Sequence, residues 1–494
     1  MPFDLVIRNA RLVDGTGAPA RLADIAVTGD RIVRVGEARD TARREFDARG
    51  RVLAPGFIDT HAHDDGALLR YPTMPFKVAQ GVTTVVVGNC GFSLAPATRE
   101  AGRLVTDSAI LNVGETPVTW EDLGGYAAAV TARRPAVNAL ALIGHNTLRY
   151  AAMGTAARPP TAAELARMRA WVEQGMAEGA CGLSTGLIYE PGRWCETEEL
   201  VELCRPVAAH GGLYATHMRD EGQRLLDSVE ETLLIGRQAG CAVHISHHKA
   251  TGPAAWGLVP RSLARVEAAA STQRVTLDVY PYTAGSTRLE ALVRLGRIDA
   301  ASAETVRLAT VPGHPEWEGK TVAAVAAVLN LPAEQALARI LEGPGRETVC
   351  IHFSMDEADV VANLRHPLVM IGSDGIPVLE GLPHPRLFGT FPRVLGRYVR
   401  EQGLLTLEEA VRKMTSLPAD AFGLVERGRI AEGMYADLVL FDPDAIADRA
   451  TYDDPKREPQ GIELVVVNGA IAYEHGRHTG AGSGRMLRYR TAAP

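Results

Sequence analysis

Short apolar runs alternate with longer amphipathic segments through the middle of the chain. Eight runs have the continuous apolar character of strands buried on both faces, at residues 52–58, 82–87, 138–143, 181–184, 213–216, 242–245, 275–280 and 369–372. Between them lie stretches with helical periodicity, such as 162–177, 196–209, 224–239 and 260–270. These units predict an α/β fold, a closed (β/α)8 barrel of the TIM type with its chemistry at the carboxyl ends of the strands.

Both ends of the chain have a different sequence pattern, in which short strand-like segments alternate with turn signals. Turn dipeptides stand at 14–15 and 29–30, and strand-like runs return at 436–441 and 464–469. Each end alone has too little apolar area for a core. We therefore expect residues 1–54 and 424–494 to form one small β-sandwich domain, and residues 55–423 to form the catalytic barrel.

One segment interrupts the alternation of strands and helices. From about residue 288 to residue 347 the pattern is helical without an intervening strand, at 301–309, 321–329 and 333–342. We interpret this segment as a helical insertion after the seventh strand, placed to form a wall or lid over the barrel mouth. An ordinary surface excursion is the alternative.

Length, charge and cysteine usage limit the classes of protein to which this chain can belong. A chain of 494 residues exceeds one compact core, and a net charge of −7 with interspersed signs argues against a nucleic-acid partner. No apolar run is long enough to span a bilayer, so we expect no membrane association. The six cysteines are not closely paired and no secretory leader is present, which favours a cytoplasmic protein with free thiols.

Candidate chemistry lies at the ends of the predicted strands. His61 and His63 end the first run, and their spacing would present both imidazoles to one side of a strand. That pair alone is equally well explained by two buried strand histidines. Further ligand-type residues each follow a run of their own: Cys90, His217, His247 and Asp374. Together these residues predict a metal centre at the barrel mouth, with zinc as the ion that suits the ligands.

Several stretches resemble a known family. Residues 55–63, PGFIDTHAH, resemble the first-strand signature of the amidohydrolase superfamily. The resemblance narrows to the N-acyl-D-amino-acid deacylases, or D-aminoacylases, through GNCG at 88–91, GHNTLR at 144–149, LSTGLIY at 183–189, THMR at 216–219, SHHK at 246–249, DVYPY at 278–282, GSDG at 372–375 and HPR at 384–386. It implies zinc-dependent hydrolysis of the amide bond of an N-acyl-D-amino acid. The preference for the D isomer follows from the resemblance alone.

The resemblance also implies how the metal donors divide. A tight ion would be held by Cys90, His217 and His247, and a second, weaker or absent ion by His61, His63 and Asp374. In this resemblance Cys90 stands where many superfamily members place a bridging carboxylated lysine or a glutamate. Asp374 is the candidate general base and acid, because that role requires a carboxylate beside the metal. A turn aspartate that serves its own loop is the alternative.

The expected substrate carries a carboxylate next to the scissile amide, which an arginine can bind bidentately. Arg386 is the candidate for this contact, supported by the resemblance. Further candidate substrate contacts are Lys249, Tyr282, Ser286 and Tyr189, although a solvated loop charge or a packed ring would explain such residues equally well.

Three other residues raise separate questions. His248 is expected to be structural, because neighbouring strand residues face opposite ways, and His145 to lie behind the ligands. Arg288 could pair with an acidic substrate side chain, but an apolar pocket is preferred.

Two other functions stay open. A cyclic amide hydrolase of the hydantoinase or dihydroorotase kind would share the metal architecture, but such enzymes usually bridge their metals with lysine, and the matching position carries Cys90. A barrel that has lost catalysis and serves as a scaffold is disfavoured, because all the proposed ligands are present.

Overall fold

The computed structural model, which describes residues 2–98, 102, 108, 110–298 and 302–489, is built around eight parallel strands. In sheet order these are β16 (Val369–Ile371), β12 (Val275–Val279), β11 (Ala242–Ile245), β10 (Leu213–His217), β9 (Gly182–Gly186), β8 (Asn138–Gly144), β7 (Val82–Val87) and β6 (Phe57–Asp59). Every residue of β7 is buried, as expected for a strand covered on both faces. The predicted barrel is confirmed, and each strand overlaps a predicted run.

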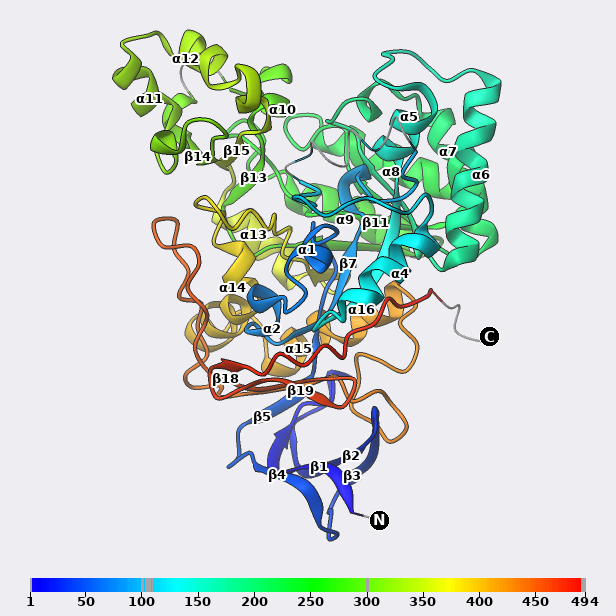
Figure 1. Ribbon diagram of the computed structural model, residues 1–494, viewed down its shortest axis with the longest axis vertical. Coiled ribbons are helices and arrows are strands. Elements are labelled where there is room, and N and C mark those ends of the chain that lie inside the picture. The colour runs from blue at the N-terminus through cyan, green and yellow to red at the C-terminus, as the bar shows by residue number, and fades with distance from the viewer. Residues whose placement is uncertain (1, 99–101, 103–107, 109, 299–301, 490–494) are drawn as a thin grey trace.

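Helices cover the outside of the barrel (Figure 1). They are α1 (Ala67–Arg70), α2 (Pro75–Val78), α4 (Leu123–Arg133), α5 (His145–Met153), α6 (Ala162–Glu178), α7 (Thr197–Ala209), α8 (Leu225–Ala239), α9 (Val259–Ala270), α13 (Glu357–Arg365), α14 (Arg386–Arg393), α15 (Leu407–Met414) and α16 (Ser416–Ala421). The start of α6 shows why such segments begin where they do. Thr161 and Glu164 form a capping box that satisfies the first free N–H groups of the helix.

The barrel closes at a seam between its first strand, β6, and its last, β16. In place of a regular ladder, the described residues form a few cross-links just beyond the two strands. The Asp374 N–H donates to the His61 carbonyl at 2.7 Å, and the His63 N–H donates to the Gly375 carbonyl at 3.2 Å. The seam therefore lies beside three of the predicted metal donors.

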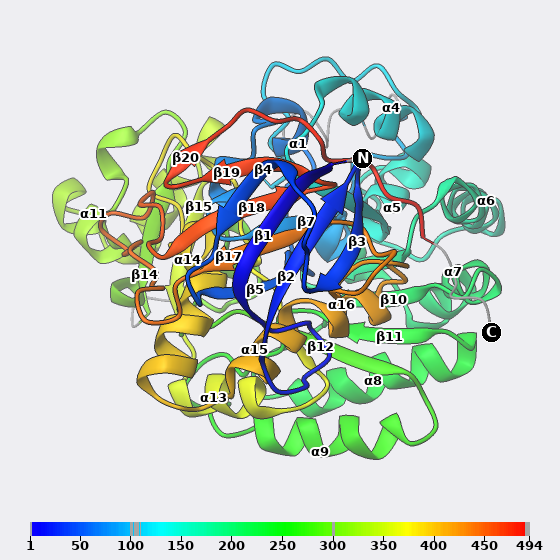
Figure 2. The same cartoon turned by 90° about the horizontal axis from the view of Figure 1, so that it is seen from below.

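Strands from both chain ends share a second sheet, which lies below the barrel (Figures 1 and 2). Its strands are β1 (Phe3–Leu12), β2 (Arg21–Thr28), β3 (Arg31–Gly36), β4 (Ala42–Asp47), β5 (Val52–Pro55), β17 (Leu438–Phe441), β18 (Ile462–Val467), β19 (Ala470–Glu474) and β20 (Arg477–His478). The two ends meet where β5 pairs antiparallel with β17. Buried Leu5, Ile25, Leu53 and Leu438, from strands of both chain ends, belong to one core cluster.

The apolar run at 52–58 is two strands rather than one. Its first part, β5, belongs to the lower sheet, and its last residues begin β6 of the barrel. The chain passes between the two sheets at Gly56, where an added Cβ would lie 2.2 Å from the Thr83 side chain. Apolar continuity alone could not show this change of partner.

The insertion after the seventh strand stands at the upper left of Figure 1, beside the barrel mouth. It contains α10 (Leu289–Arg294), α11 (Val322–Leu329) and α12 (Ala333–Ile340), with a three-stranded sheet of β13 (Ala284–Arg288), β15 (Val349–Phe353) and β14 (Val306–Thr310). Within the described part of the predicted helix at 301–309, Ala303–Thr305 forms a single 3-10 turn, but β14 begins at Val306, so the prediction of a helix without an intervening strand is wrong from there on. Buried Val306 and Leu308 flank the less buried Arg307, which is the period of a strand.

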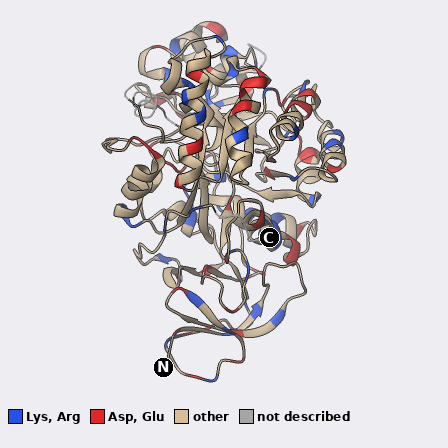
Figure 3. Ribbon diagram, turned by 90° about the vertical axis from the view of Figure 1, so that its right-hand side faces the viewer, with Lys and Arg blue, Asp and Glu red and all other residues tan. Residues whose placement is uncertain are grey.

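Charged residues of both signs are interspersed over the molecule in Figure 3. Within the described ranges, no helix combines the length and the apolar character needed to cross a membrane.

Candidate metal centre

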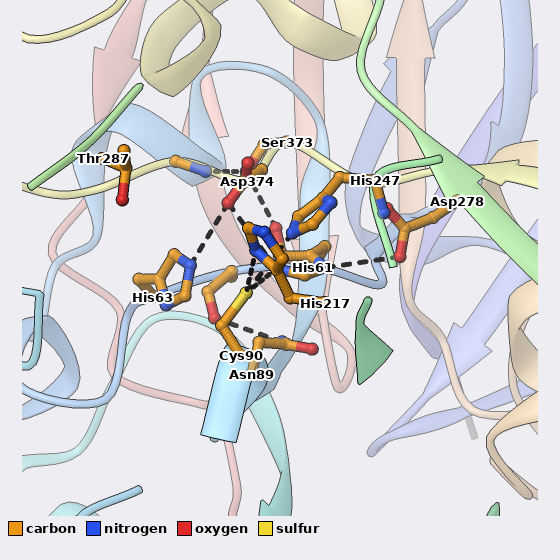
Figure 4. A network of polar contacts seen from close by, with 12 residues as sticks. His61, His63, Asn89, Cys90, His217, His247, Asp278, Thr287, Ser373 and Asp374 are labelled. Atoms are coloured by element: carbon orange, nitrogen blue, oxygen red, sulfur yellow. Dashed lines mark hydrogen bonds and ion pairs between the residues drawn. The ribbon is translucent and has the colours of Figure 1, made fainter. Parts of the chain in front are cut away.

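The six predicted donors converge at the carboxyl ends of the barrel strands (Figure 4). His61 and His63 follow β6, Cys90 lies in a single 3-10 turn after β7, and His217 ends β10. His247 follows β11, and Asp374 follows β16. All six side chains belong to buried residues, exposed by 7% or less. The six donors therefore form one group that is largely shielded from bulk solvent.

Local backbone conformation turns several donors toward the centre. Cys90, His247 and Asp374 have positive φ angles of 53°, 36° and 49°. Residues with a Cβ rarely adopt this region, and each instance costs on the order of 1–3 kcal/mol. Such strain persists where surrounding contacts enforce it. The Cys90 turn, for example, is held through its carbonyl by the Asn146 side-chain amide at 3.3 Å.

The sulfur of Cys90 is surrounded by imidazole nitrogens. Its Sγ lies 3.3 Å from His61 Nε2, 3.4 Å from His247 Nε2 and 3.8 Å from His217 Nδ1. A tetrahedral zinc ion with ordinary bond lengths places sulfur and nitrogen ligands about 3.5 Å apart. Burial alone would raise the pKa of the Cys90 thiol, but His61 and His247 lower it well below its ordinary value. The residues present therefore fit a zinc ion bound by thiolate and imidazole.

A second group of donors lies at the seam. Asp374 Oδ1 is 3.2 Å from His63 Nε2 and 3.5 Å from His61 Nε2. These three residues offer ligand atoms close enough to share a second ion. His61 contacts both groups, so the two possible ion positions are adjacent.

Arg386 fixes the ionisation of Asp374. Its Nη2 lies 2.9 Å from Asp374 Oδ2, and its guanidinium lies over the Tyr280 ring at 4.5 Å from the centroid. Burial alone would raise the pKa of Asp374, but Arg386 and His247 lower it well below the ordinary value of an aspartate. Asp374 is thus held as a carboxylate that can accept a proton.

Two carboxylates behind the imidazoles were missed by the sequence reasoning. Asp278 Oδ2 lies 2.6 Å from His244 Nε2 and 3.4 Å from His61 Nδ1, while Oδ1 accepts the His247 N–H at 2.7 Å. Glu221 Oε1 lies 3.0 Å from His247 Nδ1. Asp278 is the last residue but one of the seventh strand, and this place near the strand end is a signal that could have identified it. Glu221 follows His217 by four positions in a loop, and no sequence pattern marks it.

A cavity of about 500 Å³ opens onto the donors. Among the predicted substrate contacts, Lys249, Ser286 and Tyr189 line it. The described lining does not include Tyr282, which packs under Arg393 at 4.6 Å from its ring centroid. Tyr280, two residues earlier, borders the cavity instead. The insertion supplies one wall of the cavity, through Ser286, Thr287, Leu292, Leu295, Arg297 and His352.

The remaining candidates lie outside this cavity lining. Arg386 is fully buried behind Asp374, and its Nε and Nη1 atoms have no hydrogen-bond partner among the described residues. Arg288 lies within ion-pair distance of Glu290 and Glu347, and it borders a different, smaller cavity. It does not face the metal donors.

Two histidines near the donors serve the surrounding structure. The His248 ring lies between the Asn363 side chain at 2.7 Å and the Ser262 hydroxyl at 2.7 Å, on the side away from the cavity. His145 Nε2 lies 2.8 Å from Glu199 Oε1, and both residues are buried. Neither histidine belongs to the donor groups described above.

Comparisons with known proteins agree with this arrangement. A model described as "Amidohydrolase family" matches residues 44–473. A D-aminoacylase of Alcaligenes xylosoxydans xylosoxydans is 45% identical over 100% of this chain and 99% of that protein. The solved N-acyl-D-glutamate deacylase of Bordetella bronchiseptica, in complex with zinc and a phosphonate that mimics the tetrahedral intermediate, is 42% identical. It matches with a TM-score of 0.91, covering 99% of this chain and 100% of that one. A solved D-aminoacylase with a binuclear metal centre matches with the same TM-score and coverage at 44% identity.

Proposed function

Because the chain belongs to the amidohydrolase family, we propose that it is a zinc-dependent deacylase that hydrolyses the amide bond of N-acyl-D-amino acids. The products would be a carboxylate and a free D-amino acid. The observation that carries the proposal is the contact of the buried Cys90 sulfur with three imidazoles at the mouth of a ligand-sized cavity. Full-length relatives named for linear N-acyl substrates support it.

We assign the tight zinc ion to Cys90, His217 and His247, and a second, weaker ion to His61, His63 and Asp374. A zinc ion held there would lower the pKa of a water molecule to about 7 and polarise the amide carbonyl. The thiolate at position 90 disfavours the cyclic-amide alternative, in which a lysine usually takes this place. The completeness of both donor sets disfavours a scaffold without catalysis.

Asp374 moves the proton in this proposal. Its carboxylate faces the donors and is kept ionised by Arg386, so it can take a proton from the attacking water. It would then return that proton to the nitrogen of the leaving amine. The same residue thus acts as general base and then as general acid.

The carboxylate of the substrate would bind on the insertion side of the cavity. Lys249, Tyr280 and Ser286 line the cavity beside the donors and offer an ammonium and two hydroxyl groups. Arg386 lies behind them, and its Nη2 also donates to the Ser286 carbonyl at 3.1 Å. The Nε and Nη1 atoms of Arg386 have no described partner, and its guanidinium would add positive charge to the carboxylate site from behind Tyr280.

The substrate side chain would meet an apolar wall. Ile188, Leu292 and Leu295 line the cavity, which favours an apolar D-amino acid. Arg297 lines the same cavity and favours a second candidate, an acidic side chain. Its Nη2 already pairs with Asp220 Oδ2 at 3.2 Å, so an acidic substrate would have to compete with that contact.

Metal analysis followed by a substrate panel tests the proposal. Purified protein should contain zinc and hydrolyse N-acetyl-D-methionine or N-acetyl-D-leucine faster than the L isomers and than N-acetyl-D-glutamate. Preferred hydrolysis of a ring amide would establish the cyclic-amide alternative. Metal-free protein that cannot be reconstituted to any activity would refute the proposal in favour of a scaffold.

A further inference from the structure

One buried carboxylate stands behind two of the proposed zinc ligands. Glu221 is 2% exposed and lies in the loop that follows β10. Its Oε1 is 3.0 Å from His247 Nδ1, and its Oε2 is 3.4 Å from His217 Nε2. Each carboxylate oxygen therefore faces one imidazole.

The two rings use opposite nitrogens for the two contacts. His217 faces the Cys90 sulfur with Nδ1, and His247 faces it with Nε2. An imidazole that binds a metal through one nitrogen must carry its proton on the other. His217 Nε2 and His247 Nδ1 are those other nitrogens. Both lie beside Glu221, and His247 Nδ1 also lies 2.6 Å from Lys249 Nζ. Among the described residues, His217 Nε2 makes no hydrogen bond to any other group, which leaves it free for Glu221.

Lys249 completes the arrangement on the cavity side. Its Nζ lies 2.7 Å from Glu221 Oε1 and donates to the His247 carbonyl at 2.8 Å. A carboxylate with an adjacent ammonium can stay ionised in a buried site, where an unpaired charge would be costly. Lys249 also lines the cavity that the substrate would enter.

We propose that Glu221 is a positioning residue of the metal centre. Its carboxylate holds the proton of His217 on Nε2, which directs the Nδ1 lone pair of that ring toward Cys90. The same carboxylate holds Lys249 beside His247 Nδ1, which fixes the orientation of the His247 ring. It also ties these two ligands to Lys249, and so links the metal centre to the carboxylate site. This inference rests on the proposed function, because it takes Cys90, His217 and His247 as the zinc ligands.

The test is zinc affinity, measured on metal-free protein by competition with a chromophoric chelator. Glu221→Gln should weaken zinc binding roughly 10–100-fold, the usual cost of losing such a partner. Asp220→Asn is the matched control: the neighbouring residue loses the same charge, keeps the Oδ1 position that accepts the Gly222 N–H, and has no described contact with either imidazole. Its zinc affinity should stay within about twofold of the wild type. With cobalt in place of zinc, the absorption bands should shift in Glu221→Gln and not in Asp220→Asn.

Three outcomes would overturn the inference. Zinc affinity and cobalt bands in Glu221→Gln equal to those of the wild type would show that the ligands need no such partner. Loss of a whole zinc equivalent, with unchanged affinity for the rest, would make Glu221 a ligand itself, together with His217 and His247. If Glu221→Gln does not fold, Glu221→Asp keeps the charge but cannot reach both rings, and wild-type affinity in that variant would also overturn it.

The experiment separates this inference from the proposed function. A wild-type protein that binds no zinc would refute the metal centre as a whole. A wild-type protein that binds zinc and hydrolyses N-acyl-D-amino acids, with a Glu221→Gln variant of unchanged affinity, would refute the inference alone.

Discussion

The two halves of the donor cluster are built on different kinds of support. Cys90, His217 and His247 stand at the carboxyl ends of β7, β10 and β11, which lie inside the uninterrupted ladder of the barrel. His61, His63 and Asp374 follow β6 and β16, the two ends of that ladder. We call the first set the ladder half and the second the seam half. The ladder half is placed by strand pairing, whereas the seam half depends on side-chain contacts across the closure.

A buried lysine joins the two sides of the seam. Lys77, on α2, is fully buried, and its Nζ lies 2.6 Å from Asp59 Oδ2 and 2.9 Å from the Ser373 hydroxyl oxygen. The other oxygen of Asp59 accepts the Ser373 N–H at 2.8 Å. Asp59 precedes His61 by two residues, and Ser373 precedes Asp374. This network therefore fixes both parts of the seam half.

Removing one donor from each half gives the largest predicted effects. Cys90→Ala should abolish hydrolysis, because the ladder half would lose its thiolate and, with it, the zinc ion that we propose for this half. Asp374→Asn should lower kcat by about 10²–10⁴-fold, the usual contribution of a general base, while the tight zinc ion stays bound. Zinc content and kcat of both folded variants check this. Near-normal turnover in either variant would contradict the mechanism.

Removing the seam lysine should cost stability. Lys77→Met leaves the carboxylates of Asp59 and Asp64 buried without their cation, and we expect a loss of about 3–5 kcal/mol in the free energy of unfolding. Urea unfolding of the variant measures this loss. The exposed Lys456→Met is the control and should change little. Equal stability of the two variants would show that the seam does not depend on Lys77.

Arg386 allows a test through pH. The pKa of Asp374 lies well below that of an ordinary aspartate, so protonation of this residue should not limit kcat between pH 7 and 5. In Arg386→Met that pKa should rise, because the nearest positive charge is removed, and the fall of kcat on the acid side should move to higher pH. Arg288→Met, which removes an arginine paired outside the site, should leave the pH profile in place. An unmoved acid limb in Arg386→Met would exclude this role.

A second buried lysine gives the smallest predicted effect. Lys413 donates to the Val369 carbonyl at the start of β16 and has few charges to offset its burial, which lowers its pKa to about 8. Its folded-state pKa lies below the unfolded value of 10.5, so the stability it contributes is present above pH 10.5 and is lost as the pH falls to about 8.

From pH 7.5 to 9.5, the free energy of unfolding of the wild type should therefore rise by about 2 kcal/mol relative to Lys413→Met. The same comparison with Lys77→Met should be flat over this range, because Asp59 and Asp64 raise the pKa of Lys77 despite its burial. Denaturant unfolding at both pH values measures the difference. If the difference in free energy of unfolding between the wild type and Lys413→Met is the same at both pH values, the lowered pKa of Lys413 is contradicted.

Sequence reasoning succeeded where one local signal was enough. The barrel strands were predicted from continuous apolar runs, and the six candidate donors, chosen because they follow such runs, lie together at the barrel mouth. It failed where a partner far along the chain decides the outcome. Nothing near Lys77 shows that it will be buried against Ser373, and the run at 52–58 gives no sign that it divides between two sheets.

The choice between neighbouring tyrosines shows the same limit. Tyr280 and Tyr282 both follow the seventh strand, and the backbone beyond the strand end decides which one borders the cavity. Glu221 was missed because its role depends on His247 in the next β-α unit.

X-ray absorption of the zinc-loaded protein tests the central claim most directly. We predict a zinc–sulfur distance of about 2.3 Å in the wild type, together with nitrogen ligands at about 2.0–2.1 Å, and loss of the sulfur signal in Cys90→Ala. A wild-type spectrum with nitrogen and oxygen ligands alone would show that Cys90 does not hold the metal, and would contradict the proposed centre.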